Sequence, residues 1–236
     1  MKKVLINNQI NCLINVPDNM NQIVIYCHGF GENKQRIEQH AEVLAAYNIG
    51  MIGFDFPCHG EDITEYQSVT YDLCIDYLDK VIYYLEDTYP NIPISIIGSS
   101  FGGYIVLSYI NDKKYKFKHV YLKYPAVNFY ECLKRKLNIT DEYFDTHDYY
   151  ELPSGYKLYK QFYLDCKSHD VINNFDKGKN KIYVIQGSED KTVLVEDVKN
   201  FVINNKLKIN IVVGSEHGLK NYLGLINNEL IQILND

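Results

Sequence analysis

The chain has 236 residues, of which 46% are apolar and 23% are charged, and its formal net charge is −6. This composition is ordinary for a globular domain with a full core, and it argues against disordered and fibrous proteins. The lysines are scattered rather than clustered, so nucleic acid is a poor candidate partner, and no distinct acidic patch indicates a docking surface for another protein.

The start of the chain and its cysteines bear on where the protein works. Residues 1–19 contain two lysines but lack the apolar core and small-residue cleavage site of a signal peptide. No apolar run approaches the length of a membrane span. The six cysteines lie far apart without a C-x-x-C pair, which disfavours zinc and redox motifs and favours reduced thiols over disulfides. These features predict a cytoplasmic protein.

The first elements of the chain are strands of two kinds. Apolar and polar residues alternate across residues 4–16 around Asn7 and Asn8, a pair that tolerates positive φ angles, and this pattern predicts an N-terminal hairpin. Residues 22–29 form a continuous, largely β-branched run that ends at Gly29, as in a strand buried on both faces.

Helical and strand patterns then alternate to the end of the chain. The expected segments are a helix over 37–45, a strand at 50–56, a helix over 73–85, a strand at 92–98, a helix to about 111, a strand at 118–125, a strand at 181–190, a helix near 195–204, a strand at 208–218 and a final helix over 219–234. Continuous apolar strands alternating with amphipathic helices predict a mostly parallel α/β sheet, covered by helices on both faces and preceded by the antiparallel hairpin.

Residues 126–179, here called the cap, differ in character from the rest of the chain. They are rich in Tyr, Asp and Lys and contain Pro153, Ser154 and Gly155, which predicts short helices and loops outside the main sheet. A segment of this length would struggle to bury a core of its own. We therefore expect a single domain over residues 1–236 with a small helical cap inserted at about 126–179.

The stretch 98–102 reads Gly-Ser-Ser-Phe-Gly and fits the motif G-x-S-x-G between a strand and a helix. A tight turn of this kind holds its central residue in a strained conformation, and side chains at Gly98 and Gly102 would collide with neighbouring elements. The strain costs about 1–3 kcal/mol and persists mainly where it serves a site. Ser100 is then an exposed nucleophile at the carboxyl end of the sheet; the alternative is a glycine-rich turn that only packs tightly.

A serine nucleophile needs a base and an acid, and both have candidates at strand ends. His217 follows the last predicted strand and Asp190 follows the one before it, in the chain order Ser, Asp, His that such sheets use. Taken alone, His217 fits a loop histidine, and Asp190 fits a turn or helix N-cap with Glu189 as a substitute acid. Three matching residue types at three matching strand ends favour the triad.

The oxyanion of such a reaction is stabilised by fixed backbone amides. The N–H of Phe101, directly after the nucleophile, is one candidate. The N–H of Phe30 is the other, because Gly29 lets the chain turn inward after the first buried strand. We interpret His28 in the same loop as a structural hydrogen-bonding residue rather than a second base.

The chain resembles the α/β-hydrolase superfamily over nearly its whole length. Within it, the chain is similar to cap-bearing carboxylesterases, which include bacterial cinnamoyl (feruloyl) esterases and monoacylglycerol-lipase-like enzymes. The motifs that carry the resemblance are YCHGFGENK, GFDFPCHGED, GSSFGG, GSEDKTV and SEHG. The resemblance implies Ser100 as nucleophile, Asp190 as acid, His217 as base, and the N–H groups of Phe30 and Phe101 as the oxyanion hole.

One loop departs from the pattern of this family. Relatives show D-x-x-G-H-G-x-S where residues 55–62 read DFPCHGED, so Cys58 replaces a glycine and Asp62 replaces a serine. The residues retained are Asp55, His59 and Gly60. Because this loop supports the site and performs no chemistry, the changes affect its conformation and not the expected reaction class.

These residues predict a serine esterase that cleaves small aromatic or short-to-medium acyl esters through an acyl-enzyme intermediate. No metal or organic cofactor is required, the expected partner is a small-molecule ester, and a homo-oligomer is left open. The same triad acts on thioesters and amides, so thioesterase and peptidase or amidase activities stay as alternatives. A non-catalytic ligand-binding protein of this fold is a further alternative, although no triad member is missing.

The aromatic residues of the cap are candidates to line an acyl or aryl pocket, and the alternative is that most of them pack the cap onto the body. They are Phe129, Tyr130, Tyr143, Phe144, Tyr149, Tyr150, Tyr156, Tyr159, Phe162 and Tyr163.

Overall fold

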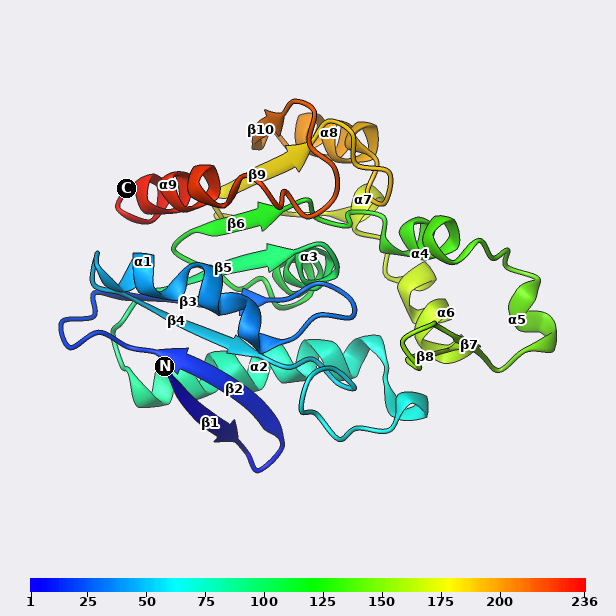
Figure 1. Cartoon of the computed structure of the whole chain (residues 1–236), viewed down its shortest axis with the longest axis horizontal. Coiled ribbons are helices and arrows are strands. Elements are labelled where there is room, and N and C mark those ends of the chain that lie inside the picture. Colours follow the sequence, from blue (N-terminus) through cyan, green and yellow to red (C-terminus); the bar gives the residue numbers. More distant parts are fainter.

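A sheet of eight strands lies at the centre of the computed structural model, which describes all residues from 1 to 236 (Figure 1). Its strand order is β1-β2-β4-β3-β5-β6-β9-β10, and the pairings of β2 with β1 and with β4 are antiparallel while the others are parallel. This confirms the predicted sheet. Its strands are β1 (Lys2–Ile6), β2 (Ile10–Asn15), β3 (Gln22–Cys27), β4 (Ile49–Phe54), β5 (Ile94–Ser99), β6 (Val120–Lys123), β9 (Ile182–Gly187) and β10 (Lys208–Val212).

The strand sequences explain the positions of the strands in the sheet. Asn7 and Asn8 make the turn between β1 and β2 with φ angles of 51° and 56°, which asparagine tolerates better than most residues. The three central strands β3, β4 and β5 are buried along their whole length. Successive residues of β3 join different hydrophobic clusters, Ile25 on one face of the sheet and Tyr26 on the other.

Helices cover both faces of the sheet (Figure 1). One face packs against α2, α3 and α8, and the other packs against the 3₁₀-helix η1, α1 and α9. The bounds of these elements are η1 (Lys34–Gln39), α1 (Ala41–Ala45), α2 (Tyr71–Thr88), α3 (Phe101–Lys113), α8 (Val195–Asn204) and α9 (Leu223–Leu234), with a second 3₁₀-helix, η2 (Tyr66–Ser68), between β4 and α2.

Two predicted helices differ from the structure. The segment 37–45 is the end of η1 followed by the short α1, because the backbone of His40 between them is not helical, with φ of −127° and ψ of −30°. The last helix begins at Leu223 rather than at Leu219, whose φ of 48° is not helical. Leu219 is nevertheless buried in the same cluster as α9, which explains its helical spacing in the sequence.

The cap lies beyond the carboxyl ends of β5 and β6, at the right of Figure 1. It contains α4 (Phe129–Leu137), α5 (Tyr143–Thr146), β7 (Tyr149–Glu151), β8 (Lys157–Tyr159), α6 (Lys160–Ser168) and α7 (Val171–Asn174). The antiparallel pair β7–β8 adds a hairpin to the predicted helices and loops, with Gly155 at a φ of 82° in its turn. Buried cap residues such as Phe162 join the cluster that contains α2 and α3. None of the helices combines the length and the apolar character needed to cross a bilayer.

Candidate active site

Ser100 lies at the corner between β5 and α3, with φ of 51° and ψ of −113°. A positive φ is costly for a residue with a side chain, at about 1–3 kcal/mol, so neighbouring contacts must hold it. The N–H of Ser100 donates to the backbone oxygen of Lys123 on β6 at 3.0 Å, and its C=O accepts from the N–H of Gly103 at 3.0 Å. The corner therefore presents the Ser100 hydroxyl at the carboxyl edge of the sheet.

The two glycines of the motif leave no room for side chains. A Cβ at Gly98 would lie 2.7 Å from the Cα of Gly103, and one at Gly102 would lie 2.1 Å from the backbone oxygen of Cys27. Both neighbours are backbone atoms, which cannot swing aside as the end of a side chain can. Close packing of α3 on β3 and β5 thus depends on glycine at both positions.

His217 and Asp190 meet Ser100 at this corner. His217 Nε2 lies 3.1 Å from Ser100 Oγ, and His217 Nδ1 lies 2.7 Å from Asp190 Oδ2. Because a carboxylate only accepts hydrogen bonds, Nδ1 carries the imidazole proton and Nε2 is free to accept from the serine hydroxyl. The ring of Tyr124 packs edge-on against His217 with centroids 4.8 Å apart.

Asp190 is fixed by the start of the segment that follows it. Its side chain is buried, and its Oδ1 accepts from the N–H groups of Thr192 and Val193 at 2.9 and 2.8 Å. Its Oδ2 accepts from Gln186 Nε2 at 3.1 Å in addition to His217. Glu189, the alternative acid, makes no hydrogen bond to the histidine.

The two candidate oxyanion donors are unpaired amides. Phe101 begins α3, so its N–H has no acceptor within the helix, and neither it nor the N–H of Phe30 donates to another part of the chain. The loop of Phe30 passes beside the serine, since a Cβ at Gly29 would lie 3.5 Å from Ser100 Cβ. Glu32 closes this loop: its N–H donates to Gly29 C=O at 3.0 Å, and its Oε2 accepts from Gly29 N–H at 3.1 Å.

His28 is a structural residue of the same loop, as the sequence predicts. Its ring is fully buried, with Nδ1 2.8 Å from the C=O of Gly29 and Nε2 accepting from the N–H of Phe56 at 3.1 Å. Burial lowers the pKa of His28 well below its ordinary value, so the ring is neutral. Both ring nitrogens are occupied, which leaves His28 no capacity to act as a base.

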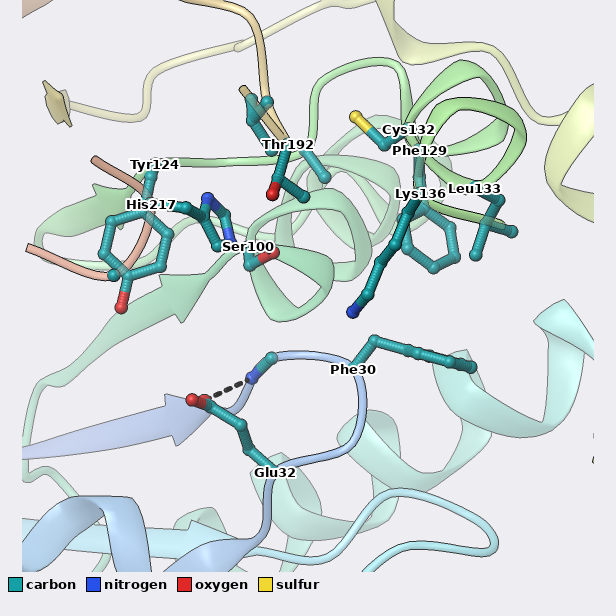
Figure 2. Close-up of a pocket in the computed structure, with 14 residues that line it drawn as sticks. Phe30, Glu32, Ser100, Tyr124, Phe129, Cys132, Leu133, Lys136, Thr192 and His217 are labelled. Atoms are coloured by element: carbon teal, nitrogen blue, oxygen red, sulfur yellow. Dashed lines mark hydrogen bonds between the residues drawn. The ribbon is translucent and has the colours of Figure 1, made fainter. Parts of the chain in front are cut away.

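A cavity of about 200 Å³ opens beside Ser100 and His217 (Figure 2). Phe129 is the one cap aromatic of the ten candidates that lines it; the other nine do not reach it. Tyr156, for example, packs its ring 4.8 Å from that of Phe30, and Tyr130 packs 4.9 Å from Tyr163. The cavity is lined by Gly29, Phe30, Glu32, Ser100, Tyr124, Ala126, Phe129, Cys132, Leu133, Lys136, Thr192, Val193, His217 and Gly218.

The sequence did not indicate that two charged residues, Glu32 and Lys136, belong to this pocket. Glu32 lies in a recognisable loop, but only the structure reveals that its carboxylate is held by Arg36 and the N–H of Gly29. Lys136 comes from α4, and Figure 2 shows its amine pointing into the pocket. The one signal in the sequence is that Lys136 has no acidic residue three or four positions away, whereas Lys134 and Arg135 have Glu131 at that spacing.

Residues 18–146, more than half of the chain, match the family described as serine aminopeptidase, S33. The chain belongs to the S33 hydrolase family. No curated protein matches it in sequence.

Solved structures resemble this S33 hydrolase over nearly its full length. Est1E from Butyrivibrio proteoclasticus with ferulic acid bound has a TM-score of 0.86 at 18% identity, covering 100% of both chains. A putative hydrolase from Agrobacterium vitis S4 has a TM-score of 0.79 at 18% identity, covering 98% of this chain and 97% of its own. Mouse α/β hydrolase domain-containing protein 10 has a TM-score of 0.75 at 14% identity, covering 99% of this chain and 98% of its own. These likenesses show the α/β-hydrolase fold that the sequence predicts.

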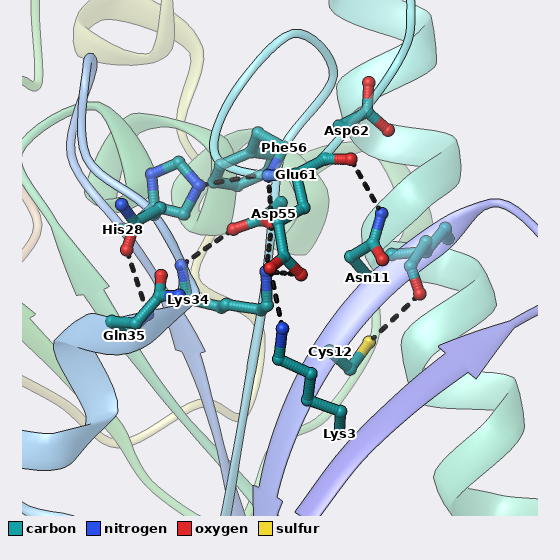
Figure 3. Close-up of polar contacts among 12 residues, drawn as sticks. Lys3, Asn11, Cys12, His28, Lys34, Gln35, Asp55, Phe56, Glu61 and Asp62 are labelled. Atoms are coloured by element: carbon teal, nitrogen blue, oxygen red, sulfur yellow. Dashed lines mark hydrogen bonds and ion pairs between the residues drawn. The ribbon is translucent and has the colours of Figure 1, made fainter.

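A buried ion pair braces the loops of this S33 hydrolase behind the site (Figure 3). Asp55 and Lys34 have side chains that are 0% and 1% exposed, and Lys34 Nζ donates to Asp55 Oδ2 at 2.5 Å. The carboxylate also accepts from the N–H groups of Lys34 and Glu61 at 2.8 and 2.9 Å. Gly60 turns the loop with a φ of 58°, and a Cβ there would lie 2.4 Å from the Asp55 carboxylate.

His59 connects this loop to Phe30 and Phe101, the two candidate oxyanion residues. Its ring is buried, with centroids 5.4 Å from Phe30 and 6.4 Å from Phe101. Its Nδ1 lies 2.9 Å from the C=O of Pro57, while Nε2 has no partner. His59 thus packs against the side chains of both candidate oxyanion residues.

The two departures from the pattern of relatives compensate for each other. Cys58 has a φ of 62°, a region that favours glycine, and its N–H donates to Asp62 Oδ1 at 2.9 Å. Asp62 also accepts from the N–H of Thr64 at 2.8 Å and from Tyr77 OH at 3.0 Å. The Asp62 carboxylate therefore stabilises the conformation that Cys58 must adopt.

Glu61 predicts a loss of stability in acid. Hydrogen bonds from Lys3 and Lys34 hold the pKa of Glu61 at about 2, below its ordinary 4.5. Because the folded pKa is depressed, this contribution is present above pH 4.5 and is lost as the pH falls toward 2. Urea unfolding measures how much the free energy of unfolding falls across this pH range. We expect it to fall less in Lys3→Ala than in wild type or in Lys2→Ala, whose lysine forms no ion pair with Glu61. An equal loss in all three proteins would contradict the assignment to Glu61.

Proposed function

We propose that this protein is a serine carboxylesterase that hydrolyses esters of small aromatic or short-to-medium acyl groups. The observation that carries the proposal is the hydrogen-bonded chain from Asp190 through His217 to Ser100. This chain ends at a strained corner beside two unpaired amides and a cavity. Membership of a serine hydrolase family supports the same reaction class.

In the first step, Ser100 Oγ attacks the ester carbonyl while His217 Nε2 takes the hydroxyl proton. Asp190 stabilises the imidazolium that forms, and its oxygens are held in place because they also accept from Thr192, Val193 and Gln186. The N–H groups of Phe30 and Phe101 donate to the oxyanion of the tetrahedral intermediate. One such donor typically contributes about 3 kcal/mol in the transition state.

Collapse of the intermediate completes acylation. The bond to the alkoxy oxygen breaks, and His217 gives its proton to the leaving alcohol. Water then enters, His217 takes one of its protons as the water oxygen attacks the acyl carbon, and a second intermediate forms in the same oxyanion site. Its collapse breaks the bond to Ser100 Oγ, returns the proton to the serine and releases the carboxylic acid.

The cavity supports a small acyl group. It measures about 200 Å³, and its side walls come from apolar residues including Phe30, Phe129, Leu133 and Val193. Est1E, which shares the fold, was solved with ferulic acid, a small aromatic acid. Both observations favour an aromatic or short-to-medium acyl ester, and thioesters of the same acids fit the same pocket.

The description of the family favours a second candidate, cleavage of the amide after an N-terminal residue. An aminopeptidase needs an acidic group for the α-ammonium of its substrate. Glu32 is the acid in this pocket, and Arg36 and the N–H of Gly29 already engage its carboxylate. Lys136 adds a cation that would repel an ammonium group. The charges of the pocket therefore favour the esterase.

A serine-reactive fluorophosphonate probe tests the proposal. We expect wild-type protein to be labelled at Ser100, as located by mass spectrometry, and His217→Gln to be labelled far more slowly. Wild type should also hydrolyse p-nitrophenyl esters and methyl ferulate faster than amino-acid p-nitroanilides. Absence of labelling would favour a non-catalytic ligand-binding protein, and faster release from the p-nitroanilides would favour the aminopeptidase.

A further inference from the structure

Three consecutive basic residues lie in the last turn of helix α4, and two of them are paired. Lys134 Nζ lies 3.4 Å from Glu131 and 3.6 Å from Asp141, and Arg135 lies 3.4 Å from Asp197. Lys136 makes no hydrogen bond and no ion pair in the structure. It is also the only one of the three that lines the pocket beside Ser100.

Lys136 gives the pocket an uncompensated positive charge. Its side chain runs from α4 toward the pocket, and its amine lies on the side of the pocket where Phe30 lies (Figure 2). The other ionised wall residue, Glu32, is paired with Arg36 outside the pocket. The chain as a whole has a net charge of −6. The unpaired ammonium of Lys136 at the mouth of a largely apolar pocket therefore makes this part of the surface locally positive.

We propose that Lys136 is a specificity residue that binds a carboxylate carried by the acyl group of the ester, at the end remote from the scissile carbonyl. This inference rests on the proposed esterase function and names its substrate class: half-esters of dicarboxylic acids. The acyl chain lies along the apolar wall made by Phe129 and Leu133, and its free carboxylate meets the ammonium of Lys136 at the pocket mouth.

The physical basis is a charge-assisted hydrogen bond. An ammonium group has three donors, and none of those on Lys136 is used within the protein. Because Lys136 is exposed, its attraction for an anion is screened by salt. We therefore expect a preference for anionic esters that is clear at low ionic strength and weaker at high ionic strength.

The test compares p-nitrophenyl hydrogen adipate with p-nitrophenyl hexanoate, in which a methyl group replaces the carboxylate. The quantity measured is the ratio of kcat/KM for the anionic ester to that for the neutral one. Lys136→Met is expected to lower this ratio about tenfold, mainly through KM of the anionic ester, and Lys136→Glu to lower it further. Lys134→Met removes the same charge from the same helix outside the pocket, and it is expected to leave the ratio unchanged.

Failure of the inference and failure of the esterase are distinguishable. An unchanged ratio in both Lys136 variants, with active enzyme, overturns the role of Lys136 alone. If wild type hydrolyses neither ester, the esterase proposal fails, and calorimetry then measures binding of monomethyl adipate to Ser100→Ala and to Ser100→Ala with Lys136→Met. Weaker binding to the double variant supports the carboxylate site, whereas equal or undetectable binding to both overturns it.

Discussion

Ser100→Ala is expected to lower kcat for p-nitrophenyl ester hydrolysis by about 10⁴-fold or more, to near the uncatalysed background. The substitution removes the oxygen that lies 3.1 Å from His217 Nε2, and with it the acyl-enzyme route. The amides of Phe30 and Phe101 would remain, so weak catalysis by oriented water can persist. Stopped assays with enough enzyme to detect single turnovers provide the measurement.

Ser99→Ala is the matched control, because Ser99 is the neighbouring serine of the same motif. Its hydroxyl is buried and donates to Tyr124 OH at 2.9 Å, and it makes no hydrogen bond to Ser100, His217 or Asp190. Loss of one such hydrogen bond is worth about 1 kcal/mol, so turnover should stay within about tenfold of wild type. Circular dichroism checks that both variants fold. Full activity in Ser100→Ala would remove the proposed mechanism.

Much of the fold could be predicted because the signals were local. The strand β3 is a continuous apolar run buried on both faces, and the helix α8 spans the predicted residues 195–204. The start of α9 could not be predicted, since Leu219 has the spacing of a helical residue but belongs to a turn. Gly218 and Leu219 have φ angles of 95° and 48°, and this turn directly follows His217. Tertiary placement of the histidine overrides local periodicity here.

The candidate site divides in the same way. Ser100, Asp190 and His217 could be nominated because parallel strands end at one edge of the sheet, so residues after strand ends converge. The residues of the pocket wall could not be predicted from the sequence, because they depend on how the cap is oriented over the sheet. Lys134 pairs with Glu131 on the same helix and with Asp141, and only the orientation of the cap shows that Lys136 lines the pocket instead.

The buried ion pair between Lys34 and Asp55 is a further feature that could not be predicted. The two residues lie far apart in the sequence, and no sequence pattern indicates that either is buried. Asp55→Ala is expected to lower the free energy of unfolding by about 3–5 kcal/mol, because it leaves the ammonium of Lys34 in a site that is 1% exposed. Glu61, 3.0 Å from Lys34 Nζ, is half in solvent and replaces little of this interaction. Equilibrium urea unfolding at neutral pH measures the loss.

Two further variants separate burial from charge at this position. Lys3→Ala breaks the exposed pair with Glu61 and should cost far less stability than Asp55→Ala, because solvent screens that pair. Asp55→Leu combined with Lys34→Met removes both buried charges, and it should recover much of the stability that Asp55→Ala loses, since apolar pairs can replace buried ions. If Asp55→Ala lowers the free energy of unfolding by less than about 1 kcal/mol, Glu61 alone is sufficient to neutralise Lys34. The buried ion pair would then not be needed to hold the loop of residues 55–62 against Phe30.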